Sequence, residues 1–365
     1  MRNLVSTVPA PLKSLLRPAI QGMRELPVRA ELVRQRRQAG GRVVFLPSRG
    51  REQSSLLRIY NVAAGLRPLG WQALVLPWTL TLAQRQRLIA RFRPDVLVMQ
   101  GARHGLNRPA LYPEYTVVYD MDDADFHLPH LEQPVREAMG QVAGVIAGSS
   151  YVADWCRGQG ADAHVVWTGT PVSKRRPVPQ SKRPPVVAWA QTRPESYTRE
   201  AEFVLEVMRR LSQQRPEVQL RLYDRQGQER GFLERFLEAG IRVEWRETCQ
   251  YSDYLRSFDD VSLGLAPLCP ETPFSRGKSF GKVLAYLDAH VPVIASDACE
   301  HGRFFGENNP ALPNDPGRWA ERMKHLLGNV GARQAVADND FARFQEQLSL
   351  EAAARRVDAV LRRFL

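Results

Sequence analysis

The sequence lacks the features that mark membrane-spanning, secreted and zinc-binding proteins. Its 365 residues contain no apolar run near the roughly 20 residues of a transmembrane helix. The amino-terminal segment lacks the apolar core of about 7–15 residues found in secretory signals. The cysteines form no Cys-x-x-Cys pair, which argues against a zinc site or a disulfide framework; they are Cys156, Cys249, Cys269 and Cys299. We therefore expect a protein of the reducing cytoplasm with no bound metal.

The composition is that of a soluble protein with two domains. Hydrophobic residues make up 44% of the chain and charged residues 25%, as in ordinary globular proteins. At about 150 residues a domain, the length predicts two domains.

Positive charge is concentrated at the amino-terminal end. The formal net charge is +12, and residues 1–42 hold nine lysines and arginines against two glutamates. We predict a basic arm over 1–41, which is either a solvated segment or one drawn to the anionic inner face of the cell membrane. Each basic residue near such a surface contributes about 1 kcal/mol. A basic arm can also attract nucleic acid, but no nucleic-acid-binding module accompanies it, so we expect no such partner.

Two stretches of alternating apolar strands and amphipathic helices follow the arm. For residues 42–172 we expect strands over 42–47, 73–76, 96–100, 117–120, 145–147 and 165–167, and helices over 54–69, 83–92 and 150–158. For residues 186–345 we expect strands over 186–190, 219–223, 241–245, 261–266 and 291–296, and helices over 199–213, 232–239, 251–258 and 319–327, with one more from about 278. Strands separated by helices are typical of parallel sheets.

Residues 173–185, SKRRPVPQSKRPP, separate the two stretches. Four prolines and five basic residues in this segment predict an extended linker. A last helix is expected over 332–364, with Leu350, Val357 and Leu361 on one apolar face.

Two parallel-sheet domains leave a ligand site between them. In such sheets, ligands bind beyond the carboxyl ends of the strands. Candidate site residues therefore lie at 48–51, 100–104, 120–125, 191–193, 246–248 and 267–278.

Gly277-Lys278-Ser279 matches only the end of a P-loop, G-x-x-x-x-G-K-[ST]. Position 272, where the first glycine belongs, is threonine, and Pro273 lacks the N–H group that a P-loop points at phosphate. We instead expect a helix with Lys278, Ser279 and Lys282 in its first turn. Lysines at the positive end of a helix suit a bound diphosphate; the alternative is two solvated lysines on the surface.

This segment resembles the nucleotide-binding core of GT-B glycosyltransferases of the "glycosyl transferases group 1" type. The family core reads roughly K-S-x-x-K-x-x-E-Y and then P-V-I-A-S. Here Lys278-Ser279-x-x-Lys282-x-x-Ala285-Tyr286 is followed by PVIAS at 292–296. Segments 58–70, 119–123, 145–150 and 258–268 are also similar to family elements and come in the family's order, so the resemblance covers about residues 42–330.

The resemblance implies an α/β fold of two Rossmann-like domains that face each other across a cleft. The carboxyl-terminal helix, 346–365, would cross back to the amino-terminal domain. Residues 186–345 would bind a nucleotide-diphosphate sugar, and residues 42–172 would hold a glycan or lipid-linked acceptor. The activity implied is sugar transfer, of the hexosyltransferase type, in polysaccharide biosynthesis. We expect no cofactor beyond this donor substrate, because lysines can stabilise the departing diphosphate.

One position departs from the family pattern. The family commonly uses a glutamate to hold the ribose hydroxyls where this chain has Ala285, and His290 replaces a glycine. Glu271 is a candidate substitute. Arg193 and Arg199 are the nearest candidates for a family cation after the first strands of the second domain, and Arg199, at a helix start, is equally well explained as a surface residue. The departure supports a second hypothesis, a non-catalytic GT-B-like binding or assembly protein that has lost part of its donor site. A sugar epimerase on the same fold would need more acids and histidines in the cleft.

These considerations give a set of candidate site residues. For the donor they are Arg193, Glu271, Ser275, Gly277, Lys278, Ser279 and Lys282. For an anion or the acceptor they are Arg49, Gly50 and Arg51, which follow the first strand.

Four aspartates within six residues form the densest carboxylate cluster: Asp120, Asp122, Asp123 and Asp125. They can supply a base for an acceptor hydroxyl, bind a divalent cation or cap a turn. We take Asp120 and Asp123, together with His104, as the catalytic candidates.

Overall fold

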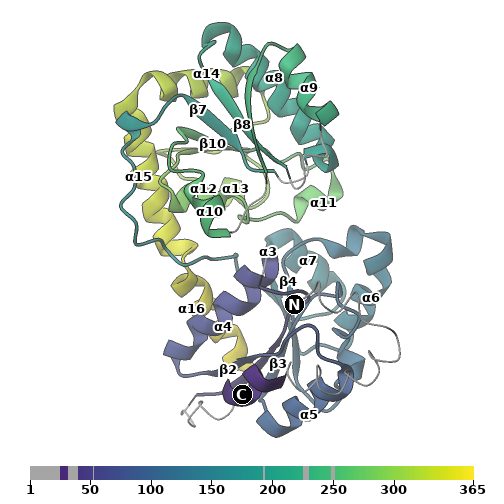
Figure 1. The fold of residues 1–365 in the computed structure, drawn as a ribbon. Coiled ribbons are helices and arrows are strands. Elements are labelled where there is room, and N and C mark those ends of the chain that lie inside the picture. The colour runs from purple at the N-terminus through teal and green to yellow at the C-terminus, as the bar shows by residue number, and fades with distance from the viewer. Residues whose placement is uncertain (1–24, 32–39, 52, 192–193, 225–229, 248–250) are drawn as a thin grey trace, which may run out of the picture.

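The protein was studied through a computed structural model, which describes residues 25–31, 40–51, 53–191, 194–224, 230–247 and 251–365. Figure 1 shows two α/β domains, one above the other, with the carboxyl-terminal helices running from the upper domain to the lower. Residues 25–31 form a short helix; the remainder of the predicted basic arm, except Gly40 and Gly41, lies outside the described residues.

The first domain is built on a six-stranded parallel sheet in the order β2-β1-β3-β4-β5-β6. Its strands are β1 (Arg42–Leu46), β2 (Gln72–Val75), β3 (Val96–Gln100), β4 (Val117–Met121), β5 (Gly144–Ala147) and β6 (Ala163–Val165). Alternate residues of β1 enter different cores, with Val44 and Leu46 on one face and Val43 and Phe45 on the other. Because both faces are covered, the strands are mostly apolar, as predicted.

Four of the five connections between these strands contain α-helix. The helices are α3 (Gln53–Ser55) continuing through a π-helical segment (Leu56–Asn61) into α4 (Val62–Leu66), then α5 (Leu82–Phe92), α6 (Pro129–Met139) and α7 (Ser150–Gly158). Helix α6 was not predicted. It contains Pro134, which removes one helical hydrogen bond, yet Leu131, Val135 and Ala138 still reach the core.

The second domain is built on a five-stranded parallel sheet in the order β11-β10-β7-β8-β9. Its strands are β7 (Val186–Trp189), β8 (Gln219–Asp224), β9 (Arg242–Glu247), β10 (Leu263–Ala266) and β11 (Val293–Ala295). The helices of this half are α8 (Thr198–Gln214), α9 (Arg230–Glu238), α10 (Tyr251–Arg256), α11 (Pro273–Arg276), α12 (Val283–Asp288), α13 (His301–Phe304), α14 (Pro316–Gly328) and α15 (Val330–Gln347).

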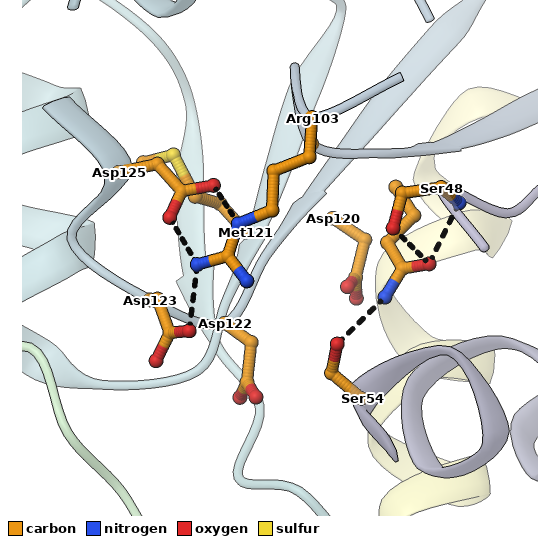
Figure 2. Close-up of a pocket in the computed structure, with 10 residues that line it drawn as sticks. Ser48, Ser54, Arg103, Asp120, Met121, Asp122, Asp123 and Asp125 are labelled. Atoms are coloured by element: carbon orange, nitrogen blue, oxygen red, sulfur yellow. Dashed lines mark hydrogen bonds and ion pairs between the residues drawn. The ribbon is translucent and has the colours of Figure 1, made fainter. Parts of the chain in front are cut away.

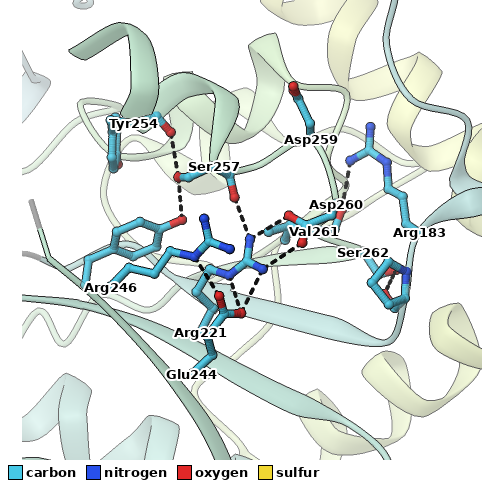
Figure 3. A network of polar contacts seen from close by, with 12 residues as sticks. Arg183, Arg221, Glu244, Arg246, Tyr254, Ser257, Asp259, Asp260, Val261 and Ser262 are labelled. Carbon is cyan, nitrogen blue, oxygen red and sulfur yellow. Dashed lines mark hydrogen bonds and ion pairs between the residues drawn. The ribbon is translucent and has the colours of Figure 1, made fainter. Parts of the chain in front are cut away.

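A buried arginine holds the second sheet to the loop before β10 (Figure 3). Arg221 on β8 is ion-paired with Glu244 on β9 at 2.8 Å and with Asp260 at 2.6 Å. The resemblance at 258–268 therefore includes a residue, Asp260, that supports the fold rather than the chemistry.

We predicted a single helix for the last helical segment, but the structure has two helices there. Helix α15 ends at Gln347, and α16 (Leu350–Leu361) begins after Ser349, whose side chain caps it by accepting from the N–H of Ala352 at 3.1 Å. The break lies where the chain passes between the domains, and Thr170 exchanges backbone hydrogen bonds with Leu348 and Leu350 there. Helix α16 then packs on α4 of the first domain (Figure 1), where a Cβ added to Gly65 would lie 2.8 Å from Ala354. The carboxyl-terminal helix thus crosses back to the first domain.

Candidate functional site

The loops after strands of both sheets meet at the interface between the domains. Lys278 Nζ lies 2.8 Å from Asp123 Oδ1, so a loop of the second domain contacts the turn after β4. Nearby, the N–H of Ser150 donates to Glu300 Oε1 at 2.8 Å and the indole of Trp167 donates to Glu300 Oε2 at 2.5 Å. Two partly buried hydrogen bonds and one ion pair therefore join the carboxyl-end loops of the two sheets.

A small polar cavity lies on the first-domain side of this interface (Figure 2). It opens at the ends of β1, β3 and β4, as expected for parallel strands. Its lining includes all four aspartates of the cluster, together with Ser48, Ser54, Gln100 and Arg103. The oxygen of the Gln100 amide accepts from the N–H and the hydroxyl of Ser48, at 3.0 and 3.1 Å, which fixes the loop after β1.

Asp120 is held as the partner of a buried arginine. Arg58, on the π-helical segment after α3, donates to both of its carboxylate oxygens, with the shortest distance 2.7 Å. Both side chains are almost fully buried. Burial raises the pKa of Asp120 despite the charge of Arg58. The ion pair with Arg58 already explains why this carboxylate is buried, so a catalytic role for Asp120 stays a prediction.

Asp123 and Asp125 are both bound to Arg103. Arg103 donates a hydrogen bond to Asp123 at 2.8 Å and one to each carboxylate oxygen of Asp125, at 2.9 and 2.5 Å. Burial alone would raise the pKa of Asp123, but the charges of Lys278 and Arg103 outweigh it and hold that pKa well below its usual range. Asp123 is thus a fixed negative charge between two cations, one from each domain.

The lysine segment is not the helix start that we predicted. Helix α12 begins only at Val283, and residues 277–282 form turns and bends. Phe280 is fully buried against Trp167 and Phe304, with ring centroids 5.1 Å from each. This anchoring bends the chain away from helical geometry and places Lys278 toward the first domain. The positive end of a long helix therefore does not explain a phosphate site here.

Two basic groups in this region have no anionic partner within ion-pair distance among the described residues. Lys282 lies over the ring of Tyr197, with Nζ 4.4 Å from its centroid, and makes no ion pair. Burial, reinforced by the charge of Lys278, lowers the pKa of Lys282 to about 7. His301 is buried, neither of its ring nitrogens has a well-formed hydrogen bond, and burial lowers its pKa to about 4. Buried polar groups normally have partners, so these two side chains suit a bound anion.

Gly277 lies where the two domains approach each other closely, and its predicted role in donor binding stays a prediction. A Cβ at this position would lie 2.6 Å from the Cβ and 2.9 Å from the N of Ala124. The glycine is therefore needed for close approach of the two domains. The N–H groups of Gly277 and Lys278 donate to the carbonyls of Phe274 and Ser275. Of the three residues Gly277, Lys278 and Ser279, only Ser279 has an N–H group with no backbone acceptor among the described residues.

Ser275 and the unpredicted Glu200 form a buried pair behind the lysines. The Ser275 hydroxyl donates to Glu200 Oε1 at 2.8 Å, and the N–H of Cys269 donates to the same oxygen at 3.1 Å. Glu200 lies in the first turn of α8, so it ties that helix to the loop after β10. Glu200 stands in register with the apolar stripe of α8, four residues before Val204, so an acid at a position predicted to be buried is the signal that could have found it. Ser275 was a donor candidate. Ala285, where the family has glutamate, is buried in the hydrophobic core.

The other candidates occupy more peripheral positions. Arg49 and Arg51 are exposed, and the Arg51 guanidinium lies 5.2 Å from the ring centroid of Tyr60; Gly50 packs near Trp78. His104 accepts at Nδ1 from the N–H of Leu106 at 3.1 Å, and burial together with nearby Arg85 lowers its pKa. Glu271 is exposed. Arg193 lies outside the described residues.

Within the described part of the chain, no group of three or more His, Cys, Asp or Glu side chains is placed to hold a metal ion. None of the helices in that part has both the length and the apolar character to cross a bilayer.

Solved structures with the same architecture are numerous, although no protein-family model and no curated protein sequence matches this chain. A glycosyltransferase from Rickettsia africae has a TM-score of 0.67 at 10% identity, covering 89% of this chain and 99% of its own. Anabaena HepE, solved with UDP, has a TM-score of 0.64 at 15% identity, with 89% and 100% covered. Staphylococcus aureus TarM, solved with UDP and α-GlcNAc-glycerol, has a TM-score of 0.56 at 12% identity. That match covers 78% of this chain and 58% of TarM.

The fold of this chain is therefore that of the GT-B proteins. The same fold is found in a putative UDP-N-acetylglucosamine 2-epimerase from Listeria monocytogenes, with a TM-score of 0.54 at 12% identity that covers 89% of this chain and 96% of the epimerase. The fold thus does not choose between sugar transfer and epimerisation.

Proposed function

We propose that the protein is a glycosyltransferase that moves a sugar from a nucleotide-diphosphate donor to a glycan or lipid-linked acceptor. The observation that carries the proposal is the half-buried Lys282, which makes no ion pair among the described residues and feels the charge of Lys278. The buried His301, whose ring nitrogens lack well-formed hydrogen bonds, lies close to Lys282. A diphosphate would supply the missing negative charge. HepE and TarM were both solved with UDP, and HepE also with UDP-glucose, which supports a uridine nucleotide as the first ligand to test.

The sugar-transfer step mainly needs fixed positive charge beside the departing diphosphate. In sugar transfer, the bond from the anomeric carbon to the diphosphate breaks and negative charge develops on the departing oxygens. Lys278 and Lys282 would stabilise that charge, in a partly dry site where electrostatic effects are strong. Burial holds the pKa of Lys282 near 7 before the anion arrives, so diphosphate binding would favour its charged form.

The acceptor would occupy the first-domain side. The cavity there is lined by hydroxyl, amide, carboxylate and guanidinium groups and by Met121, and its polar groups suit a sugar hydroxyl. A hexosyl donor, a role in polysaccharide biosynthesis and a cytoplasmic, peripheral position on the membrane belong to this proposal. They rest on the sequence resemblance and on the basic amino-terminal arm.

Two other functions remain to be separated by experiment. Ala285 offers no polar atom to a ribose, which favours a GT-B-like binding protein without catalysis. Epimerisation would invert one stereocentre of the donor sugar and would need no acceptor.

One set of measurements distinguishes the three. Calorimetry with UDP and GDP tests for the nucleotide site. Incubation with a panel of UDP- and GDP-sugars, with and without simple glycoside acceptors, then tests for transfer or hydrolysis, detected as released nucleotide. Binding with nucleotide release supports a transferase, binding without any turnover supports the non-catalytic alternative, and interconversion of donor sugars supports an epimerase. Absence of binding to every nucleotide would refute the proposal.

A further inference from the structure

Asp122 differs from the other three aspartates of the cluster in having a free carboxylate oxygen. Both oxygens of Asp120 are contacted by Arg58, and those of Asp125 by Arg103. Asp123 is bound by Lys278 and Arg103, one at each oxygen. In Asp122 the hydroxyl of Thr168 donates to Oδ1 at 2.7 Å, and Oδ2 has no partner among the described residues.

The Asp122 carboxylate is nevertheless held in a defined position. Thr168, which fixes Oδ1, itself accepts from Arg58 at 3.4 Å. On the other side, a Cβ added to Gly148 after β5 would lie 2.5 Å from Asp122 Oδ1, 2.8 Å from its carbonyl oxygen and 2.9 Å from its Cα. The glycine therefore leaves space for both the backbone and the carboxylate of Asp122. The hydrogen bond from Thr168 and this close packing together fix the carboxylate.

Asp122 lies on the side of the interface where we propose that the acceptor binds. It lines the cavity with Ser48, Ser54 and Gln100, and Figure 2 shows its carboxylate turned away from Arg103. Its side chain is 22% exposed, unlike that of Asp120 at 4%. Asp123, the next residue, contacts Lys278, so the lysines proposed for the donor diphosphate lie beside this cavity.

The cluster has four carboxylates and three cations. Arg58 lies 2.7 Å from Asp120 and 4.0 Å from Asp122 Oδ1, and Arg103 with Lys278 compensates Asp123 and Asp125, so one negative charge remains and Asp122 has the longest contact. One uncompensated negative charge beside a polar cavity disfavours an anionic group there and favours a neutral hydroxyl.

We propose that Asp122 is the group that accepts the proton of the acceptor hydroxyl, and that the cavity receives a neutral sugar or polyol hydroxyl. This rests on the proposed sugar transfer. In the step, the acceptor oxygen forms a bond to the anomeric carbon and its proton passes to Asp122 Oδ2. The bond from that carbon to the diphosphate breaks, and its electron pair leaves with the nucleotide beside Lys278 and Lys282.

The direct test compares Asp122→Asn with the wild-type protein in two measurements. UDP affinity by calorimetry should be unchanged within about twofold, because Asp122 lies on the acceptor side. Transfer from the donor sugar that the wild type uses should fall by about 10²–10⁴-fold, the usual contribution of a general base. Transfer within about twofold of the wild-type rate would overturn the inference.

A chemical rescue separates a base from a structural residue. Azide needs no deprotonation to attack an anomeric carbon, so sodium azide should restore UDP release by Asp122→Ala at least about tenfold and yield a glycosyl azide detectable by mass spectrometry. Wild-type turnover should not rise. A variant that binds UDP normally but shows no azide rescue would count against Asp122 as the base.

The glycine supplies a matched pair of variants. Gly148→Ala should displace the Asp122 carboxylate and slow transfer at unchanged UDP affinity. Gly158→Ala, at the end of α7 where an added Cβ meets nothing within 4 Å, should leave transfer unchanged. Equal rates in the two variants would contradict the positioning. If the wild-type protein neither binds UDP nor consumes any donor sugar, the proposed function fails. If the wild-type protein turns over normally and Asp122→Asn is equally active, only the inference about Asp122 fails.

Discussion

Lys278 and Asp123 form an ion pair across the two domains, with 2.8 Å between Nζ and Oδ1. The lysine that we propose for the donor diphosphate is thus already neutralised by the acceptor domain. Although burial alone would lower the pKa of Lys278, the negative charge of Asp123 outweighs it and raises that pKa. A diphosphate arriving at this position would compete with Asp123 for the same ammonium group. Donor binding and the contact between the domains are therefore coupled in this proposal.

Replacing Lys278 by alanine should weaken UDP binding. A charge-assisted hydrogen bond contributes about 1.5–3 kcal/mol, which corresponds to a roughly 10- to 150-fold rise in Kd. Calorimetry measures it directly. Lys174→Ala, an exposed lysine in the segment between the domains, is the matched control and should bind UDP normally. Equal affinity in both variants would remove Lys278 from the site.

Replacing Asp123 by asparagine should have the opposite effect on UDP. The change removes the competitor for Lys278 and nearly preserves the shape of the side chain. Because a partly exposed ion pair contributes up to about 1 kcal/mol, UDP affinity should rise by up to about fivefold. Adding Asp123→Asn to Lys278→Ala should then have no further effect on UDP affinity. If Asp123→Asn raised UDP affinity equally in the wild-type and Lys278→Ala proteins, Asp123 would not act by competing with UDP for Lys278.

UDP binding should be accompanied by proton uptake at alkaline pH. The pKa of Lys282 is lowered from 10.5 to about 7 in the free protein, so this side chain is mostly neutral at pH 8. A bound diphosphate favours the ammonium form, and complex formation should therefore take up close to one proton at pH 8 and little at pH 6. Calorimetry in buffers of different ionisation enthalpy measures the uptake. Lys282→Met should abolish it, whereas Lys182→Met should retain it.

The same lysine should influence stability with a definite sign. Between about pH 7 and 10.5, the unfolded chain holds a proton on Lys282 that the folded protein lacks, so the contribution of this residue to stability increases with pH. The cost of the buried charge is complete below pH 7. Lys282→Met should therefore raise the Tm of the ligand-free protein more at pH 6 than at pH 9. A pH-independent difference in Tm would argue against the lowered pKa.

Breaking the buried pair of Arg58 and Asp120 should destabilise the first domain. Removing one member leaves an uncompensated buried charge, at a cost of about 3–5 kcal/mol. Arg58→Met should therefore reduce the free energy of unfolding by that amount in urea denaturation, and adding Asp120→Leu should recover part of it. Arg136→Met breaks a half-exposed pair with Glu132 and should cost less than about 1 kcal/mol. Similar losses in the two single variants would contradict this account.

Glu300→Ala should loosen the contact between the domains. The change leaves the N–H of Ser150 and the indole of Trp167 without their acceptor, and each unsatisfied buried donor costs about 1–3 kcal/mol. We expect a lower Tm and a larger radius of gyration in small-angle scattering. The exposed Glu307, changed to alanine, is the control. An unchanged radius in Glu300→Ala would show that this carboxylate does not hold the domains together.

The sequence predicted the strands better than the segments around the site. Buried parallel strands such as β3 and β4 are continuous apolar runs, a local signal that needs no tertiary information. Helix α6 was missed because Pro134 argues locally against a helix, and packing of Leu131 and Val135 overrides that preference. The helix start at Lys278 was wrong because burial of Phe280 between Trp167 and Phe304 decides the path of that segment.

The sequence by itself determined two parallel α/β domains, the segments that follow their strands and the lysines that make a diphosphate plausible. These follow from hydrophobic periodicity and residue type, which are local properties. Only the tertiary structure decided the state of each charged group. It pairs Asp120 with Arg58 and Asp123 with Lys278, and it leaves Asp122 Oδ2 and Lys282 without an ion-pair partner among the described residues. Partners of this kind are dozens of residues or more apart in the chain, so only the packing of the two domains determines which charges meet.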